Sequence, residues 1–141
     1  MSQVNEYLGA LFDLSGRKAL VTGGGGGVGL MISRALVNSG RSWGAPLEQF
    51  PWKAWNDVMT LNVAAPFTLT RQLVPLLSAA GNELSPARVL NIGSVMGTMP
   101  HGFPAYSYSA SKAAIHHVTR ILANELADKK IAVNAIAPGP F

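Results

Sequence analysis

Short apolar runs that stop at glycine or at small polar residues predict three strands along the chain. The first run, in RKALVTG, covers residues 19–22 and ends at Gly23. The segments ARVLNIGS and IAVNAIAPG repeat this form at residues 87–94 and 131–139. Apolar runs of this length between turn formers are typical of buried strands.

Between these runs, apolar residues recur at the spacing of an α-helix. The helix expected after the glycines is amphipathic, ends near Gly40, and carries four apolar residues on one face: Val28, Met31, Ile32 and Ala35. A longer helical pattern covers residues 52–80. Pro66 and Pro75 are expected to kink or break it, because proline lacks a backbone donor and clashes with the preceding turn.

The last helix is predicted to begin at Ser107 or Ser109 and to end at Ala127. Loops rich in turn formers separate it and the other elements, as in SWGAPLEQFP and GNELSP. Strands that alternate with helices indicate a parallel, doubly wound sheet. We therefore expect an α/β protein with one domain over residues 1–141.

Composition adds a shortage of charged surface. Hydrophobic residues make up 48% of the 141 residues and charged ones 13%, against about 25% charged in ordinary soluble domains. Such a chain either buries surface against a partner or has lost polar segments. The net charge of +4 is spread thinly, which argues against nucleic-acid binding.

Other classes of protein are disfavoured by what the sequence lacks. The absence of cysteine excludes disulfides and thiolate metal sites. The first residues do not form a basic start followed by an apolar core, and no uncharged apolar stretch reaches the roughly 18 residues of a membrane span. We expect a cytoplasmic protein without membrane association.

The glycine-rich segment TGGGGGVG, residues 22–29, joins the first predicted strand to the first predicted helix. A diphosphate rests on the amide donors of a helix N-terminus only where the backbone approaches it without intervening Cβ atoms. In this context the glycines favour nucleotide binding. A flexible turn with surplus glycine is the alternative.

The segment YSYSASKAA offers two tyrosines and one lysine at the start of the last predicted helix. Residues four apart on a helix differ by about 40° in direction, and residues six apart by about 240°. Tyr108 therefore shares a face with Lys112, whereas Tyr106 does not. An ammonium near a phenol favours the ionised phenol, which would make Tyr108 a proton donor or acceptor near neutral pH. The alternative is an ordinary exposed helical pair.

Five motifs occur in one order: a Thr-Gly-x-x-x-Gly-x-Gly turn, LNV in the long helix, LNIGS, YSASK and VNAIAPG. Together they resemble the short-chain dehydrogenase/reductase family over nearly the whole chain, and its fungal 3-oxoacyl carrier-protein reductases of the rhamnolipid type in particular. The resemblance implies a Rossmann-like fold and an NAD(P)H-dependent oxidoreductase that transfers hydride to a ketone or 3-oxoacyl substrate. NADP(H) is favoured over NAD(H) by family analogy only.

The resemblance also implies four catalytic roles. Tyr108 would be the general acid that protonates the carbonyl oxygen, and Lys112 would assist its ionisation and hold the nicotinamide ribose. Ser94 would hydrogen-bond the carbonyl, and Asn62 would hold a water in a proton relay. The residues implied in cofactor binding are Thr22, Gly23, Gly27, Val28, Gly29, Asn38, Tyr108, Lys112, Pro138 and Gly139.

Each of these residues also has a plainer interpretation. Ser94 could simply end a strand, and Asn62 could bond its own helix backbone. Pro138 and Gly139 could form only a turn. Tyr106 is interpreted as a substrate-side or packing aromatic.

The histidines and tryptophans are assigned structural roles. Loop and helix-surface positions are expected for the three histidines, which are His101, His116 and His117. No spacing among them indicates a metal site. Core or interface positions are expected for the three tryptophans: Trp43, Trp52 and Trp55.

Compared with a complete family member, the chain lacks room for a second and a third strand. Residues 30–61 would have to hold them, yet each crossover needs about 10–12 residues. LVNSG, residues 36–40, resembles both a helix end and the family's Asn-Ala-Gly strand end, so we expect an internal deletion near residues 35–38. APGPF stops early, and we expect a C-terminal truncation too. Lost polar segments would explain the low charged fraction.

Two hypotheses therefore stand. The first is a reductase that acts on a small carbonyl or alcohol, or on an acyl thioester. The second is an inactive fragment that binds partners through its two long helices, residues 52–80 and 108–127. The same helices are expected to form a homodimer or homotetramer.

Overall fold

The computed structural model describes residues 42–100 and 102–139. The predicted strand at residues 19–22, the glycine turn and the helix after it lie outside these ranges. The described helices and strands are α3 (Trp52–Met59), the π-helical turn η2 (Thr60–Ala64), α4 (Ala65–Ala80), β1 (Ala87–Ile92), α5 (Tyr106–Leu126) and β2 (Ile131–Ile136). Short 3₁₀ turns lie at η1 (Leu47–Gln49), η3 (Val95–Gly97) and η4 (Ala127–Lys129).

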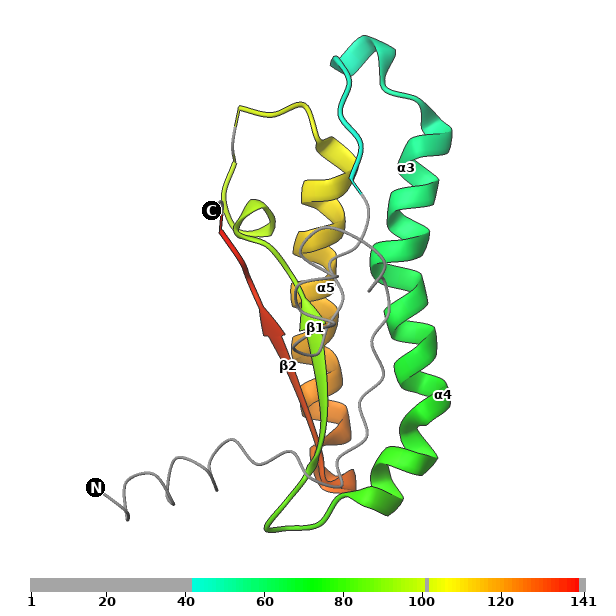
Figure 1. Ribbon diagram of the computed structural model, residues 1–141, viewed down its shortest axis with the longest axis vertical. Helices are drawn as coiled ribbons and strands as arrows, with labels where there is room; N and C mark the ends of the chain where they lie inside the picture. The colour runs from blue at the N-terminus through cyan, green and yellow to red at the C-terminus, as the bar shows by residue number, and fades with distance from the viewer. Residues whose placement is uncertain (1–41, 101, 140–141) are drawn as a thin grey trace, which may run out of the picture.

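Strands β1 and β2 form a parallel pair, as the two apolar runs predict. Their register pairs Ala87 with Ile131 and Ile92 with Ile136. Helix α5 connects them and runs antiparallel to both, so its first turn and the carboxyl ends of both strands lie at the same end of the molecule (Figure 1). This arrangement is the crossover unit of an α/β fold, and it fixes where the polar motif residues meet.

The rod made of α3, η2 and α4 stays helical from residue 52 to residue 80, so the expected breaks at the two prolines do not occur. Pro66 lies in the first turn of α4, where a missing N–H is tolerated. Directly before it, the N–H of Ala65 donates to Thr60 O, which widens the turn to π-helical geometry. Pro75 lies inside α4 without ending it.

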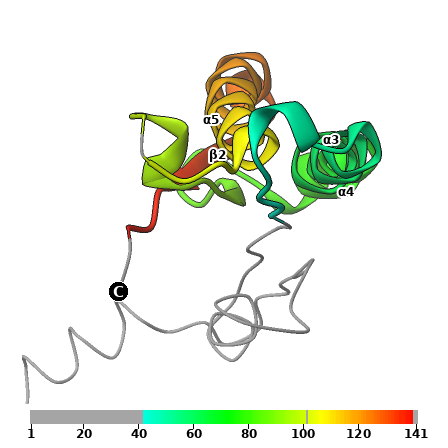
Figure 2. The same ribbon diagram turned by 90° about the horizontal axis from the view of Figure 1, so that it is seen from above.

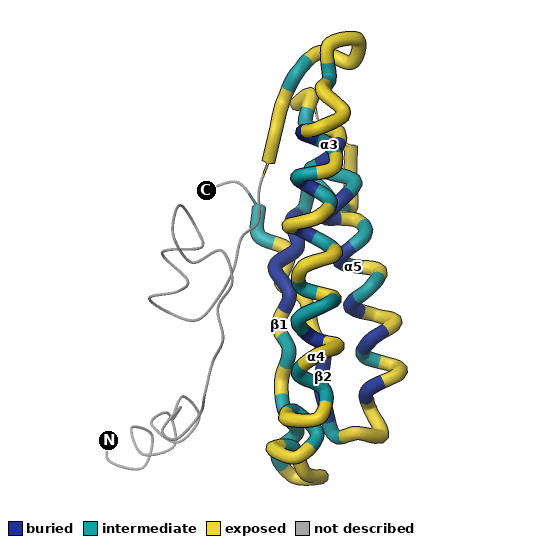
Figure 3. Tube along the Cα trace, turned by 90° about the vertical axis from the view of Figure 1, so that its right-hand side faces the viewer, coloured by how far each residue is buried: buried dark blue, intermediate teal, exposed yellow. Residues whose placement is uncertain are grey.

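Helices α4 and α5 pack on one face of the sheet, beside each other (Figure 2). The core there is formed by four buried apolar residues of α5 and β2: Leu122, Leu126, Ile131 and Val133. Figure 3 shows the buried positions of α5 and the strands along their shared contact. On the opposite face of the sheet, Leu90 and Ile136 are 42% and 47% exposed.

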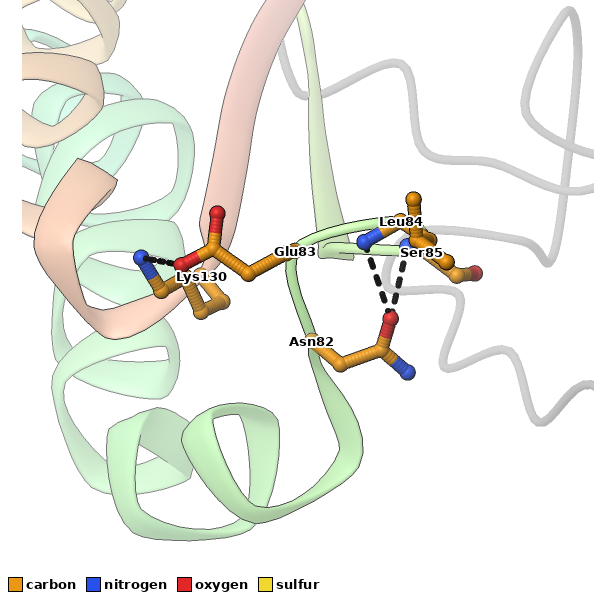
Figure 4. A network of polar contacts seen from close by, with 5 residues as sticks. All are labelled: Asn82, Glu83, Leu84, Ser85 and Lys130. Atoms are coloured by element: carbon orange, nitrogen blue, oxygen red, sulfur yellow. Dashed lines mark hydrogen bonds and ion pairs between the residues drawn. The ribbon is translucent and has the colours of Figure 1, made fainter.

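The predicted turn GNELSP is confirmed between α4 and β1. Asn82 Oδ1 accepts hydrogen bonds from the backbone N–H groups of Leu84 (3.0 Å) and Ser85 (2.9 Å), as Figure 4 shows. Beside it, Lys130 Nζ lies 2.6 Å from Glu83 Oε1. Lys130 itself has a left-handed backbone, with φ 59°, at the turn into β2.

Among the described helices, none is long and apolar enough to cross a membrane. Helix α5 begins at Tyr106, one residue before the earlier of the two expected starts, and ends at Leu126. Its first turn is closed by Ser109 N–H, which donates to Ala105 O at 3.0 Å.

Candidate active site

The two strands leave the sheet side by side, and their pairing continues beyond the strand ends. Gly93 N–H donates to Ile136 O at 2.7 Å, and Val95 N–H donates to Pro138 O at 3.1 Å. These bonds place Ser94 next to the Pro138–Gly139 segment. In parallel sheets, ligands bind at this carboxyl end of the strands.

Ser94 is buried and caps the N-terminus of the short turn η3. Its Oγ accepts a hydrogen bond from Met96 N–H at 3.2 Å, and its own N–H donates to His116 Nε2 at 3.3 Å. A serine hydroxyl has one proton to donate and two lone pairs. Accepting from Met96 therefore leaves the hydroxyl proton of Ser94 free for another acceptor.

Tyr108 and Lys112 meet as the helical spacing predicts. Lys112 Nζ lies 5.4 Å from the centroid of the Tyr108 ring and donates to Ile92 O at 2.7 Å. The Lys112 side chain thus crosses from α5 to the end of β1, and the residue is only 2% exposed. Burial lowers the pKa of Lys112 from 10.5 to about 8.

Asn62 reaches the same part of α5 from the π-helical turn. Its Nδ2 donates to Ser111 Oγ at 2.9 Å, and Ser111 Oγ donates to Tyr108 O at 2.7 Å. Asn62 and Ser111 are both buried. This chain of bonds connects η2 to the turn of α5 that carries Tyr108. Turns of π-helix are frequent at functional sites.

Two glycines let the strand end approach α5 closely. A Cβ at Gly97 would lie 2.5 Å from the backbone carbon of Lys112. A Cβ at Gly93 would lie 1.7 Å from His116 Nε2. The absence of side chains at these positions allows η3 and the end of β1 to contact the helix face that carries Lys112.

The structure thus brings together Asn62, Ser94, Tyr108, Lys112 and the segment Pro138–Gly139. The other residues implied in cofactor binding lie outside the described ranges: Thr22, Gly23, Gly27, Val28, Gly29 and Asn38. No group of three or more His, Asp or Glu side chains suited to a metal ion occurs in residues 42–100 and 102–139.

The interpretations of the aromatic residues are partly corrected. Tyr106 packs edge-on against Phe50, with ring centroids 5.5 Å apart, as expected of a packing aromatic, and is 40% exposed. Trp43 and Trp52 are 43% and 72% exposed, which rules out a core position for them in this chain. Trp52 stacks on Trp55, with centroids 6.3 Å apart.

The surface position expected for His116 was wrong. Its half-buried ring lies against Gly93 and accepts the Ser94 N–H. Burial lowers the pKa of His116, and the charges of Lys112 and Arg120 lower it further. His117 is exposed, as expected, and His101 lies outside the described residues.

The contacts of His116 and Ser111 at this end of the molecule were not predicted from the sequence, although helical spacing could have indicated both. The spacing of four that pairs Tyr108 with Lys112 continues to His116. Ser111 lies one residue before Lys112 and four after Ser107, on the face of α5 that is fully buried. Following the spacing of four along the whole predicted helix would have identified both residues as candidates for contacts with neighbouring elements.

A hollow of about 450 Å³ lies elsewhere, beside Asn82, Lys130 and Asn134. Its lining comes from the first residues of β2, from the turns before both strands and from the end of α5, and none of the residues implied in catalysis or cofactor binding lines it. The candidate active site is therefore the carboxyl end of the sheet and not this hollow.

Comparison with known proteins points to one family. Residues 36–141 match the family model described as short chain dehydrogenase. The rhamnolipids biosynthesis 3-oxoacyl-[acyl-carrier-protein] reductase of Pseudomonas aeruginosa is 51% identical over 104 residues, which are 74% of this chain and 41% of that protein. This relative is bacterial, which corrects the expected resemblance to fungal members.

Two further matches agree. The 2-dehydro-3-deoxy-D-gluconate 5-dehydrogenase of Escherichia coli is 40% identical over 91 residues, 64% of this chain and 34% of that protein. The solved structure of the Pseudomonas aeruginosa RhlG/NADP active-site complex has 43% identity and a TM-score of 0.73, over 99% of this chain and 48% of that one. The chain spans less than half the length of each of these relatives.

Proposed function

Because the chain belongs to the short chain dehydrogenase family, we propose that it is an NAD(P)H-dependent reductase of ketones or 3-oxoacyl thioesters. One observation carries the proposal: the buried Lys112 ammonium lies 5.4 Å from the ring centroid of Tyr108, at the carboxyl ends of both strands. The relatives named above include a 3-oxoacyl reductase and an NADP complex. They support the substrate class and NADP(H) in preference to NAD(H).

The donor groups at the strand ends fit a nicotinamide nucleotide. The Lys112 ammonium and the Tyr108 hydroxyl can donate to ribose hydroxyls, and the backbone at Pro138 and Gly139 can border the nicotinamide. When bound, the reduced nicotinamide supplies a hydride. The chain's own residues supply position, hydrogen bonds and a proton.

In this proposal, Ser94 and Tyr108 act on the carbonyl oxygen. The hydroxyl proton of Ser94, left free by the bond from Met96 N–H, donates to the oxygen and orients it. The phenol of Tyr108 gives its proton to that oxygen as negative charge develops there. Lys112 stabilises the ionised phenol that remains.

Asn62 is proposed to restore the proton to Tyr108 through a water. Its amide is already fixed by the bond to Ser111 Oγ, 2.9 Å away. A side chain amide has both donor and acceptor groups, so it can hold a water in one orientation. The proposed path runs from solvent through this water and the Lys112 side chain to the phenol.

Calorimetric titration of the purified chain with NADPH and with NADH tests cofactor binding. We expect saturable heat with NADPH and weaker binding of NADH. Absence of heat with both nucleotides, from a sample shown by circular dichroism to be folded, would contradict the proposed reductase. It would favour the alternative of an interaction module without catalysis.

Replacing each tyrosine in turn tests the general acid. We expect Tyr108→Phe to abolish NADPH oxidation with a 3-oxoacyl thioester, because the proton donor is lost. Tyr106→Phe is the matched control, since its ring packs against Phe50 and its removal of a hydroxyl leaves that contact intact. Equal activity in both variants would exclude Tyr108 as the acid.

The alternative function is supported by a separate feature of the surface. Six residues of α3, η2, α4 and α5 line a shallow, mainly apolar hollow of about 280 Å³: Met59, Thr60, Val63, Ala64, Phe67 and Val118. We propose that a second copy of the chain covers it, in a homodimer or homotetramer formed through the two long helices. We also propose that the protein is cytoplasmic.

A further inference from the structure

His116 lies among the polar residues at the strand ends, although none of the motifs includes it. Its Nε2 lies 3.3 Å from the backbone nitrogen of Ser94. An N–H can only donate, so Nε2 must be the unprotonated nitrogen of a neutral ring whose proton is on Nδ1. The bond therefore specifies both the charge state and the tautomer of the histidine.

The ring also fits the strand end sterically. A Cβ at Gly93 would lie 1.7 Å from His116 Nε2 and 2.3 Å from Cδ2, so any side chain at Gly93 would displace the ring. Gly93 N–H is meanwhile paired with Ile136 O at 2.7 Å. The two successive peptide groups that flank Gly93 are thus both held, the first by β2 and the second by the imidazole.

From these contacts we propose that His116 is a positioning residue for Ser94, which it holds through the Ser94 backbone N–H in the orientation that presents the hydroxyl to a substrate carbonyl. Only the presentation of the hydroxyl to a substrate rests on the proposed function. The hydrogen bond and its dependence on a neutral imidazole are properties of the folded chain itself.

Protonation of His116 removes the lone pair that accepts the bond. The charged groups that act on the ring from α5 are Lys112 and Arg120, and both disfavour a second positive charge. The segments packed against the ring from the sheet, residues 91–99 and 131–139, contain no titratable side chain. Burial and these cations lower the pKa of His116 below 6.5, so the bond is intact at neutral pH and is lost on acidification.

Nuclear magnetic resonance on the full chain, with ¹⁵N-labelled histidine and serine, tests the inference without any need for activity. Between about pH 5 and pH 8, the interval in which histidine titrates, we expect the Ser94 amide resonance to move with the same midpoint as the His116 ring. At neutral pH the ring should show an unprotonated Nε2. A protonated Nε2, or a Ser94 amide that does not follow His116, would overturn the proposal.

Three variants separate the hydrogen bond from simple packing. His116→Leu keeps volume but has no acceptor, and we expect its Ser94 amide to exchange with solvent on the order of three- to tenfold faster. Gly93→Ala should give the same result by displacing the ring. His116→Gln retains an acceptor and should restore most of the protection. Equal exchange in the Leu and Gln variants would show that packing alone matters.

His117→Gln is the control, because the exposed ring of His117 lies near Arg120, with 3.5 Å between the two nitrogens, and has no contact with the strand end among the described residues. Where the chain reduces a substrate, His116→Leu should lower kcat more than it raises KM, and should flatten the acid limb of the pH profile. If NADPH neither binds nor is oxidised, the resonance data still decide the role of His116, so the two proposals fail independently.

Discussion

Lys112 holds an ammonium group inside the protein, and this has a measurable consequence for stability. Its pKa is lowered by burial to about 8 in the folded chain, against 10.5 when exposed. Between these values the unfolded chain holds a proton that the folded chain has released. Unfolding therefore takes up a proton in this window, and the free energy of unfolding rises with pH across it, by up to about 3 kcal/mol.

Lys112→Met tests this assignment. We expect urea unfolding curves measured at several values from pH 8 to pH 10.5 to show a rise in stability for the natural chain relative to the variant. Both proteins are compared in a Tyr108→Phe background, because the phenol of Tyr108 faces Lys112, so that the difference between them isolates Lys112. Parallel curves for the two proteins would mean that the ammonium is not buried as the structure has it.

The pairing of Tyr108 with Lys112 could be predicted from the sequence, because it depends only on the angle between residues four apart on one helix. The contacts of Ser94 could not. Its hydroxyl and its N–H bond to Met96 and His116, and the second of these lies 22 residues away on another element. Bonds of this kind depend on how β1 and α5 are placed, which no local pattern encodes.

At the scale of elements, the contact between η3 and α5 depends on Gly97. A Cβ there would lie 2.5 Å from the Lys112 carbon and 2.6 Å from the Ala113 nitrogen, and these backbone atoms of a helix cannot move aside separately. We expect Gly97→Ala to destabilise the chain by about 1–3 kcal/mol, the usual cost of overpacking. Chemical denaturation of the natural chain and the variant measures this loss of stability.

Gly102→Ala is the control for this change, since a Cβ at Gly102 would meet nothing within 4 Å. The same loss of backbone freedom in the unfolded chain accompanies both substitutions. Equal stability of the two variants would show that η3 does not approach α5 as closely as the structure has it.

The bond between Asn62 and Ser111 joins the π-helical turn to α5, and a double-mutant cycle measures its strength. We expect Asn62→Ala and Ser111→Ala to be coupled by about 0.5–1.5 kcal/mol, because the bond is buried and 2.9 Å long. Additive effects of the two substitutions on the free energy of unfolding would indicate that the two elements are held by apolar packing alone.

The strands and helices followed from the sequence more closely than the site did. Apolar runs ending in small residues identified β1 and β2, and helical spacing identified α5 to within one residue at its end and one or three residues at its start. The π-helical turn did not follow, because Pro66 removes one donor without deciding whether the helix breaks or widens. Packing of η2 against α5, through Asn62 and Ser111, favours the wider turn.

At the scale of the whole molecule, the rod of α3, η2 and α4 lies beside α5 and leaves apolar residues uncovered between them. Phe67, 41% exposed, lines the hollow of about 280 Å³ together with Met59, Val63 and Val118. A chain with only 13% charged residues has few polar groups with which to solvate such a surface. Uncovered apolar area of this kind marks interfaces.

Phe67→Glu tests whether a second copy covers this hollow. We expect the natural chain to sediment as a dimer or tetramer and the variant as a monomer, because the carboxylate would be buried without a partner in the interface. Leu84→Glu is the matched control, since Leu84 is 98% exposed in the loop before β1 and does not line the hollow. A monomeric natural chain, or an unchanged mass for Phe67→Glu, would exclude this hollow as the interface. A monomer that still binds NADPH would further show that the site at the strand ends is complete within one chain.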